Sequence, residues 1–218
     1  MKTKVYTEDG SQTIYSEKFN EHYHSTYGAL SESEHVFISA GLNHSQLKHI
    51  KIFEVGFGTG LNTILTYKIS GTENLTVEYT SIELYPLHLE IIDELDYKSF
   101  LTSNEFKKFK LMHSAEWNKT IEIDKNFTLH KIKADLLDFK FLERYDLIYF
   151  DAFAPDKQPN MWSAHIFESL YNACNTNAIL TTYSSKGLVK RNLRNAGFKV
   201  SRLSGPPGKR HILRAEKL

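Results

Sequence analysis

The chain has 218 residues, of which 41% are hydrophobic and 24% are charged, as in folded soluble proteins and unlike disordered chains. It has no apolar stretch near the ~18 residues that a membrane-spanning helix needs, and its amino terminus lacks the apolar core of a secretory signal. Cys174 is the only cysteine, so no internal disulfide is possible, and no Cys/His cluster has zinc-site spacing. We therefore expect a cytoplasmic protein with no membrane association and no bound metal.

The net charge of +1 hides an asymmetry along the chain. Residues 184–218 hold ten lysines and arginines against Glu216 alone, a net charge of +9, and residues 1–183 carry the remaining −8. A basic segment of this kind favours binding to a polyanion such as a nucleic acid. A solvated helix face with ordinary surface lysines is an equally good explanation of the charge by itself.

Residues 1–49 are polar and aromatic and predict a short strand or hairpin followed by a helix near 28–42. From residue 50 onward, strand and helix patterns alternate, which is typical of a parallel α/β sheet. We therefore divide the chain into an N-terminal extension, 1–49, packed on a catalytic domain, 50–218. The predicted strands are 50–55, 76–82, 128–132, 146–150, 178–183, 199–203 and 211–214, and the predicted helices are 61–69, 86–95, 161–175 and 186–196.

Three details complete the predicted fold. Pro86 suits the first turn of its helix, and Gly197 suits the end of the last one. A short Gly/Pro turn at 204–209 joins the final two strands, so these should pair antiparallel at the edge of the sheet. The segment 97–126 has no pattern that we can assign. The prediction is thus a mostly parallel seven-stranded sheet whose last strand is antiparallel.

The sharpest motif runs from Ile52 to Asn62, where an apolar strand enters a Gly-x-Gly-x-Gly turn and then a helix. Glycines allow positive φ angles and let the backbone approach a ligand closely. A dinucleotide site would require Gly-x-Gly-x-x-Gly, but Leu61 follows Gly60. The spacing with Glu54 before Gly56 instead matches motif I of class I methyltransferases, which have a Rossmann-like fold.

Acidic residues follow successive predicted strands. Glu83 ends the second strand, where a carboxylate can bind both ribose hydroxyls, and Asp135 comes just after the third. Asp151 ends the fourth strand and opens the stretch Asp-Ala-Phe-Ala-Pro. Ligands of open α/β sheets bind at the carboxyl ends of the strands. Together with Glu54, these residues should border one crevice, although Asp135 alone could equally be a helix N-cap.

These segments resemble the methyltransferase domain of the bacterial tRNA 5-methylaminomethyl-2-thiouridine biosynthesis enzymes. The likeness rests on Gly56–Asn62, on Asp151–Pro155 with the following Lys157, Pro159, Met161 and Trp162, and on a block from Thr182 to Arg210. Ala152 stands where we would expect Gly in fused relatives. The resemblance implies a class I fold and methyl transfer from S-adenosylmethionine (SAM) to the 5-aminomethyl group of the wobble uridine, with the tRNA anticodon stem-loop as partner.

Many such enzymes are fused to an FAD-dependent oxidase, and 218 residues leave no room for one here. We therefore expect a stand-alone form without FAD, which depends on a separate enzyme for its aminomethyl tRNA. The predicted cofactor-binding residues are Glu54, Gly56, Phe57, Gly58, Gly60, Asn62, Glu83, Leu84, Asp135, Leu136 and Asp151, with Asp151 also catalytic through orientation of the amine. The predicted substrate-binding residues are Phe153, Lys157, Trp162, Tyr183, Lys186, Lys190, Arg191, Lys209 and Arg210, and Tyr23 is a further candidate for stacking on a base.

Three rival functions follow from the same pattern. An aminopropyltransferase of the spermidine-synthase type shares the fold and the Asp after the fourth strand, but a basic surface would repel its polyamine substrate. A non-catalytic RNA-binding protein could retain the fold with an inactive site, which measurement of SAM affinity would reveal. A nicotinamide oxidoreductase is disfavoured by Leu61.

Overall fold

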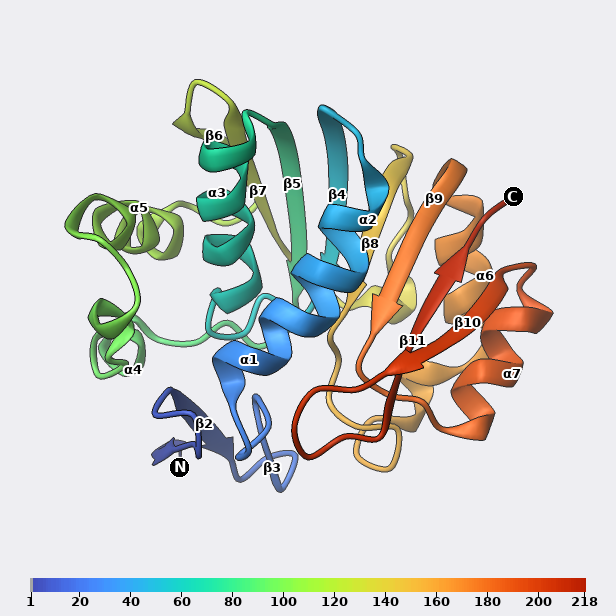
Figure 1. Ribbon diagram of the computed structural model, residues 1–218, viewed down its shortest axis with the longest axis horizontal. Coiled ribbons are helices and arrows are strands. Elements are labelled where there is room, and N and C mark those ends of the chain that lie inside the picture. The colour runs from blue at the N-terminus through green and yellow to red at the C-terminus, as the bar shows by residue number, and fades with distance from the viewer. Residues whose placement is uncertain (1) are drawn as a thin grey trace.

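Eight strands form the central sheet of the computed structural model, which describes residues 2–218 (Figure 1). They are β4 (His49–Val55), β5 (Thr76–Glu83), β6 (Thr120–Asp124), β7 (Phe127–Lys133), β8 (Tyr145–Phe150), β9 (Cys174–Thr182), β10 (Lys199–Ser204) and β11 (His211–Glu216). Their order across the sheet is β10-β11-β9-β8-β4-β5-β7-β6. The five central strands are parallel, and β11 is antiparallel to both of its neighbours. The mostly parallel sheet and its antiparallel last strand are thus confirmed.

The predicted number of seven strands is wrong. The eighth strand, β6, lies in the segment that sequence analysis left unassigned and pairs antiparallel with β7 through a register shift. The same segment holds a 3₁₀ turn (Tyr97–Ser99) and α5 (Ser103–Ser114). A reciprocal capping box between Thr102 and Glu105 starts α5 and was the available sequence signal.

The predicted helices exist, with different bounds. They are α3 (Leu61–Glu73), α4 (Leu89–Asp93), α6 (Ala164–Asn172) and α7 (Gly187–Asn195). Pro86 does not lie in a first helical turn, because α4 begins only after the extended His88. The predicted helix over 161–175 is shortened by a 3₁₀ turn (Pro159–Trp162) before it and by β9 after it. Gly197 has φ 110° directly after α7, as predicted.

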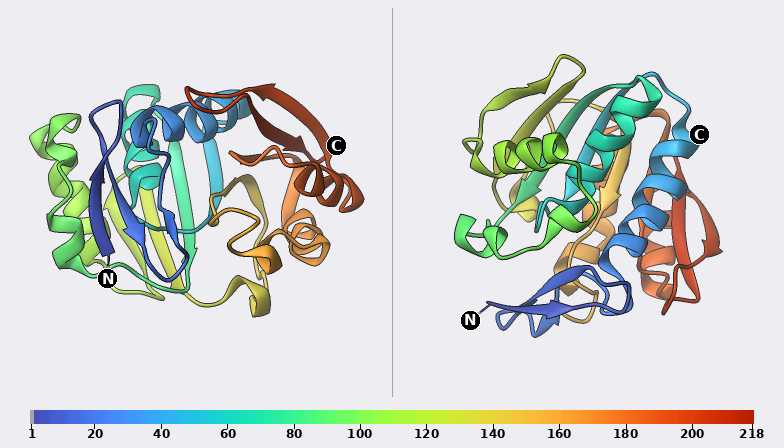
Figure 2. Two further views of the ribbon diagram at one scale, coloured as in Figure 1. Left: turned by 90° about the horizontal axis from the view of Figure 1, so that it is seen from below. Right: turned by 60° about the vertical axis from the view of Figure 1, so that its left-hand side comes forward.

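Helices lie on both faces of the sheet (Figures 1 and 2), and an apolar core fills each face. Neighbouring strand residues alternate between them: Ile52 packs with α3 and α5 on one face, and Phe53 belongs to the core that contains α6 and α7 on the other. This alternation follows from the two-residue period of a strand. Both faces of the central strands are therefore buried, as a parallel sheet requires.

The N-terminal residues form a second sheet and a long helical segment. Strands β1 (Lys2–Tyr6), β2 (Gln12–Ser16) and β3 (Glu21–His22) pair antiparallel beyond the carboxyl ends of the parallel strands (Figure 1). α1 (Ala29–Ser33), the π-helical η1 (Glu34–Leu42) and α2 (Asn43–Ser45) follow without a break. This helical segment belongs to the same core as α3 and α5, with Val36 and Phe37 buried.

The domain boundary at residue 50 stays a prediction, and Met1, which belongs to the predicted extension, lies outside the described residues. None of the helices within residues 2–218 is long and apolar enough to span a membrane.

Candidate active site

A cavity of about 600 Å³ opens at the carboxyl ends of β4, β5, β7 and β8. Each of these strands delivers predicted residues to its lining: Gly56 follows β4, Glu83 ends β5, Asp135 follows β7 and Asp151 follows β8. The sheet topology therefore assembles in one place residues that are far apart in the sequence.

The glycine loop needs its glycines for both conformation and space. Gly56, Gly58 and Gly60 have φ angles of 91°, 50° and 72°, which other residues adopt only with strain. A Cβ on Gly56 would lie 2.7 Å from the Asp151 carbonyl oxygen, and one on Gly58 would lie 3.2 Å from the Tyr23 ring. Gly56, Phe57, Gly58 and Asn62 line the cavity, whereas Gly60 faces the buried His113 and does not.

Glu83 is bound to the loop on one side of the cavity. One carboxylate oxygen accepts the Gly58 N–H at 3.2 Å and the other accepts the Tyr85 N–H at 2.8 Å. Leu84, also predicted, lines the cavity beside it. A carboxylate held in this way at the end of the second parallel strand has the position expected of a ribose-binding residue.

Asp135 and Leu136 lie along the same wall of the cavity. The Asp135 carboxylate accepts the Leu137 N–H at 2.9 Å and caps a short 3₁₀ turn (Leu136–Asp138). The N-cap role that the sequence left open is therefore present, together with exposure to the cavity.

Asp151 has a polar partner inside the cavity. Asn62 on α3 donates a hydrogen bond to its carboxylate at 2.9 Å. Burial raises the pKa of Asp151 to about 7, although the hydrogen bond from Asn62 lowers it. The carboxyl group is thus a stronger base than an ordinary aspartate and titrates near neutral pH.

The prediction that Glu54 borders the crevice is wrong. Its side chain is fully buried beneath the loop, where it accepts hydrogen bonds from Ser81 at 2.7 Å and Thr63 at 3.2 Å. Burial raises the pKa of Glu54 to about 8. Glu54 is not among the residues that line the cavity. Its hydrogen bonds instead hold β4, β5 and α3 together.

Aromatic side chains form the opposite wall. Phe153 stacks on Phe19 with ring centroids 4.4 Å apart and meets the edge of Tyr23 at 5.0 Å. The prediction that Trp162 stacks on a ligand is wrong, because its side chain is completely buried among Phe150 and Phe167. Its indole N–H donates to the Phe153 carbonyl oxygen at 2.8 Å and so fixes the loop that carries Phe153.

The predicted basic residues divide into two groups. Lys157 and Lys209 line the cavity together with the predicted Tyr183. The others do not line the cavity: Lys186, which forms an ion pair with Asp156, and Lys190, Arg191 and Arg210. Lys186, Arg191 and Arg210 are exposed and Lys190 is partly exposed.

Among the N-terminal residues, sequence analysis named only Tyr23 as a candidate, and Tyr23 does line the cavity. Eleven of the lining residues fall between Tyr15 and Glu32. Among them, Glu21 accepts the Ala154 N–H at 2.8 Å, which ties β3 to the loop after Asp151. No motif marks this stretch, and only its density of tyrosine, histidine and glutamate hinted at a site.

The lining fits the cofactor that the sequence resemblance implies. Gly56 and Gly58 leave room for a close ligand, and Glu83 lies at the strand end where a ribose-binding carboxylate is expected. Carboxylates outnumber lysines around the cavity, which suits the positive sulfonium of SAM; they are Glu21, Glu32, Glu83, Asp135 and Asp151 against Lys157 and Lys209.

Two known proteins are similar in sequence to almost the whole chain. The tRNA 5-methylaminomethyl-2-thiouridine biosynthesis bifunctional proteins MnmC of Campylobacter fetus and Burkholderia thailandensis are 32% and 30% identical to the chain over 93% and 98% of its length. The chain spans about a third of the length of these relatives, 34% and 35%.

Two solved structures resemble this structure over nearly all of its length. The crystal structure of MNMC2 from Aquifex aeolicus has a TM-score of 0.80 and 26% identity, and the match covers 99% of this chain and 70% of that one. Spermidine synthase from Thermotoga maritima has a TM-score of 0.60 at 11% identity, covering 100% and 72%, and shares the fold alone. The aminopropyltransferase alternative therefore gains no support beyond the fold.

A family model described as S-adenosyl-L-methionine-dependent methyltransferase matches residues 97–218, more than half of the chain. The match begins at residue 97 and so does not include the glycine loop or Glu83. These two features therefore support a SAM-dependent methyltransferase independently of the match. The chain belongs to this family of SAM-dependent methyltransferases.

Proposed function

We propose that the enzyme transfers a methyl group from SAM to the amine of 5-aminomethyl-(2-thio)uridine at the wobble position of tRNA, and so forms the 5-methylaminomethyl nucleoside. The names of the relatives support this acceptor. The observation that carries the proposal is Asp151, a partly buried carboxylate with a raised pKa between the glycine loop and the aromatic wall.

The chemistry of the acceptor explains why such a carboxylate is useful. An alkylamine has a pKa of about 10.4 and is mostly protonated at neutral pH, when its nitrogen has no lone pair to offer. When bound, SAM supplies a methyl group activated by the sulfonium. Asp151 accepts the proton that the ammonium loses, the nitrogen–carbon bond forms and the carbon–sulfur bond breaks.

A raised pKa strengthens the role of Asp151 as a base. Orientation alone would be the expected contribution of an aspartate with an ordinary pKa, near 3.9. With a pKa of about 7, Asp151 holds a transferred proton well enough to act as a general base, an effect worth about 10²–10⁴-fold in rate. Asn62, which donates to the carboxylate, keeps it aimed into the cavity.

The tRNA would bind through two kinds of contact. A splayed base of the anticodon loop can stack on aromatic side chains, and Phe153, Phe19 and Tyr23 offer such a surface. Phosphates would pair with Lys157 and Lys209 at the cavity and with Lys186, Lys190, Arg191 and Arg210 outside it, giving affinity that falls with salt. A separate enzyme would supply the aminomethyl tRNA.

Transfer of tritium from methyl-labelled SAM tests this function. Label should appear in tRNA that carries 5-aminomethyluridine, should be found on the wobble nucleoside, and should be absent from tRNA without this group. Binding of SAM with no label in either tRNA would leave the enzyme a methyltransferase and refute this acceptor.

A further inference from the structure

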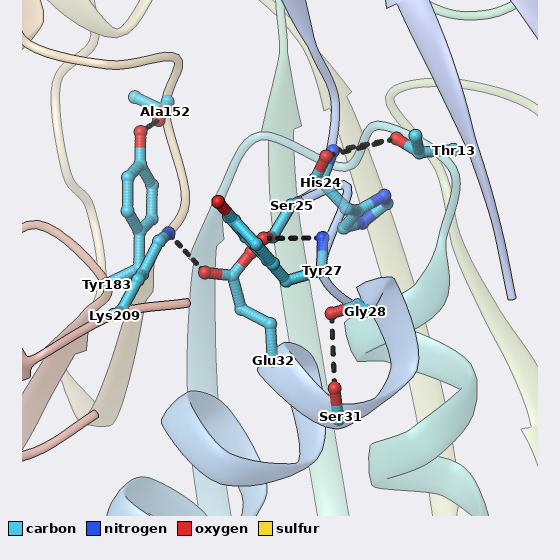
Figure 3. Close-up of polar contacts among 10 residues, drawn as sticks. All are labelled: Thr13, His24, Ser25, Tyr27, Gly28, Ser31, Glu32, Ala152, Tyr183 and Lys209. Atoms are coloured by element: carbon cyan, nitrogen blue, oxygen red, sulfur yellow. Dashed lines mark hydrogen bonds and ion pairs between the residues drawn. The ribbon is translucent and has the colours of Figure 1, made fainter. Parts of the chain in front are cut away.

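A lysine of the chain itself lies in the cavity, on the side where the proposed function places the acceptor amine. Lys209 lies in the turn between β10 and β11, and its ammonium forms an ion pair with Glu32 on α1 (Figure 3). The same ammonium lies 3.9 Å from the centre of the Tyr183 ring. A carboxylate and the face of an aromatic ring together make a site for a positively charged nitrogen.

This site is built into the structure. The Glu32 side chain is only 10% exposed, and one of its oxygens is held by the Ser25 N–H at 3.1 Å. Tyr183 is fixed by a hydrogen bond from its hydroxyl to the Ala152 carbonyl oxygen at 2.9 Å (Figure 3). The lysine is less confined than its partners, with 27% of its side chain exposed.

The site also lies close to the reacting group. Tyr183 is anchored to the residue that follows Asp151. The charge of Glu32 raises the pKa of Asp151 and the charge of Lys209 lowers it, so both are within electrostatic range of that carboxylate. All four side chains line the same cavity.

We propose that Glu32 and the ring of Tyr183 recognise the positively charged aminomethyl group of the substrate, and that Lys209 holds this position until the substrate displaces it. This inference rests on the proposed function. Glu32 selects the acceptor by its charge, and the proton that the ammonium loses still goes to Asp151. The displaced lysine becomes available for a phosphate of the RNA.

The test compares two anticodon stem-loop RNAs that differ only in the wobble nucleoside, 5-aminomethyluridine or the uncharged 5-hydroxymethyluridine. Their dissociation constants are measured with S-adenosylhomocysteine present, so that no transfer occurs. The ratio of the two constants isolates the recognition of charge, because contacts to phosphates are common to both RNAs. The wild-type enzyme should prefer the aminomethyl RNA.

The two partners of the ion pair should have opposite effects. Glu32→Gln should reduce the preference about tenfold, since a charge-assisted hydrogen bond is lost and an uncompensated lysine is left behind. Lys209→Met should increase the preference, because it removes the internal competitor. Glu34→Gln on the same helical segment and Lys199→Met on β10, both exposed, are matched controls that should leave the ratio unchanged.

A purely structural ion pair would give a different result. Both variants would then weaken binding of both RNAs alike and leave the ratio at its wild-type value, which would overturn the inference. Wild-type enzyme that methylates aminomethyl tRNA while Glu32→Gln keeps full preference would refute the role of Glu32 alone. Wild-type enzyme that neither prefers nor methylates this RNA would refute the proposed function itself.

Discussion

The two walls of the cavity differ in origin and in chemistry. The wall at the carboxyl ends of the parallel strands consists of short motifs at strand ends, with the glycine loop, Glu83 and Asp151. The other wall is built mainly from the stretch between Tyr15 and Glu32, which is rich in aromatic and acidic side chains, and is completed by Phe153, Tyr183 and Lys209. The first wall suits a nucleoside cofactor, and the second suits a base that carries a positive charge. Changes in the first should alter SAM binding or chemistry, and changes in the second should alter acceptor binding.

The largest effect should come from Asp151→Asn. Because the amide cannot accept the proton of the ammonium, kcat should fall about 10²–10⁴-fold, with SAM affinity changed only a few-fold. Single-turnover kinetics together with calorimetric SAM binding would measure both. Asp138→Asn, at an exposed position outside the cavity lining, is the control, and wild-type kcat in Asp151→Asn would remove the catalytic assignment.

Glu83→Ala should be next in size and should affect the cofactor. Loss of a carboxylate that is predicted to bind both ribose hydroxyls should weaken SAM binding about 10–100-fold, which calorimetry can measure. Glu78→Ala changes an exposed glutamate on the same strand and should bind SAM normally. An unchanged SAM affinity in Glu83→Ala would mean that this wall does not hold the ribose.

Phe19→Ala tests the opposite wall. Loss of the ring that stacks on Phe153 should raise KM for aminomethyl tRNA about tenfold, while the dissociation constant of SAM stays within twofold. Tyr6→Ala, on β1 and 68% exposed, is the control. Equal damage to SAM and tRNA binding would break the division between the two walls.

The last prediction concerns stability instead of binding or chemistry and involves Glu54. Its pKa of about 8 in the folded protein exceeds the ordinary value of 4.5, so folding takes up a proton and stability falls as pH rises from about 4.5 to 8. Glu54→Gln cannot ionise. Its melting temperature relative to wild type should therefore increase by roughly 10 °C between pH 5 and pH 8.5. Thermal unfolding at both pH values measures this difference, and an identical pH dependence would contradict it.

Local patterns in the sequence were enough to predict the parallel strands, the helices around them and the wall formed at their ends. Strand ends in a parallel sheet meet at one edge, so Glu83, Asp135 and Asp151 could be placed together from the sequence alone. The prediction for Glu54 was wrong because the sequence does not tell whether a carboxylate at a strand end points into the crevice or under the loop. The prediction for Trp162 was wrong because a large aromatic side chain can pack in a core as readily as it can bind a ligand.

The second wall depends on tertiary contacts that have no local signature. Glu21 reaches the Ala154 N–H across 133 residues of sequence, and Lys209 reaches Glu32 from the far end of the chain. The segment that holds β6 and α5 was also not predicted, although the Thr102–Glu105 capping box marks the start of α5 in the sequence. Charge had marked residues 184–218 as basic, but only the fold separates Lys209, inside the cavity, from Arg210 outside it.

The N-terminal lining residues all come from a single stretch of fewer than twenty residues, Tyr15 to Glu32. This segment is continuous in sequence and joins the rest of the fold through contacts such as those of Glu21 and Glu32. The residues of the other wall are scattered over four strands and pack closely on one another, as Gly56 does on the Asp151 carbonyl oxygen. Under the proposed function, replacement of this one segment, with its contacts to Ala154 and Lys209 kept, would change the acceptor and leave the methyl-donor side intact.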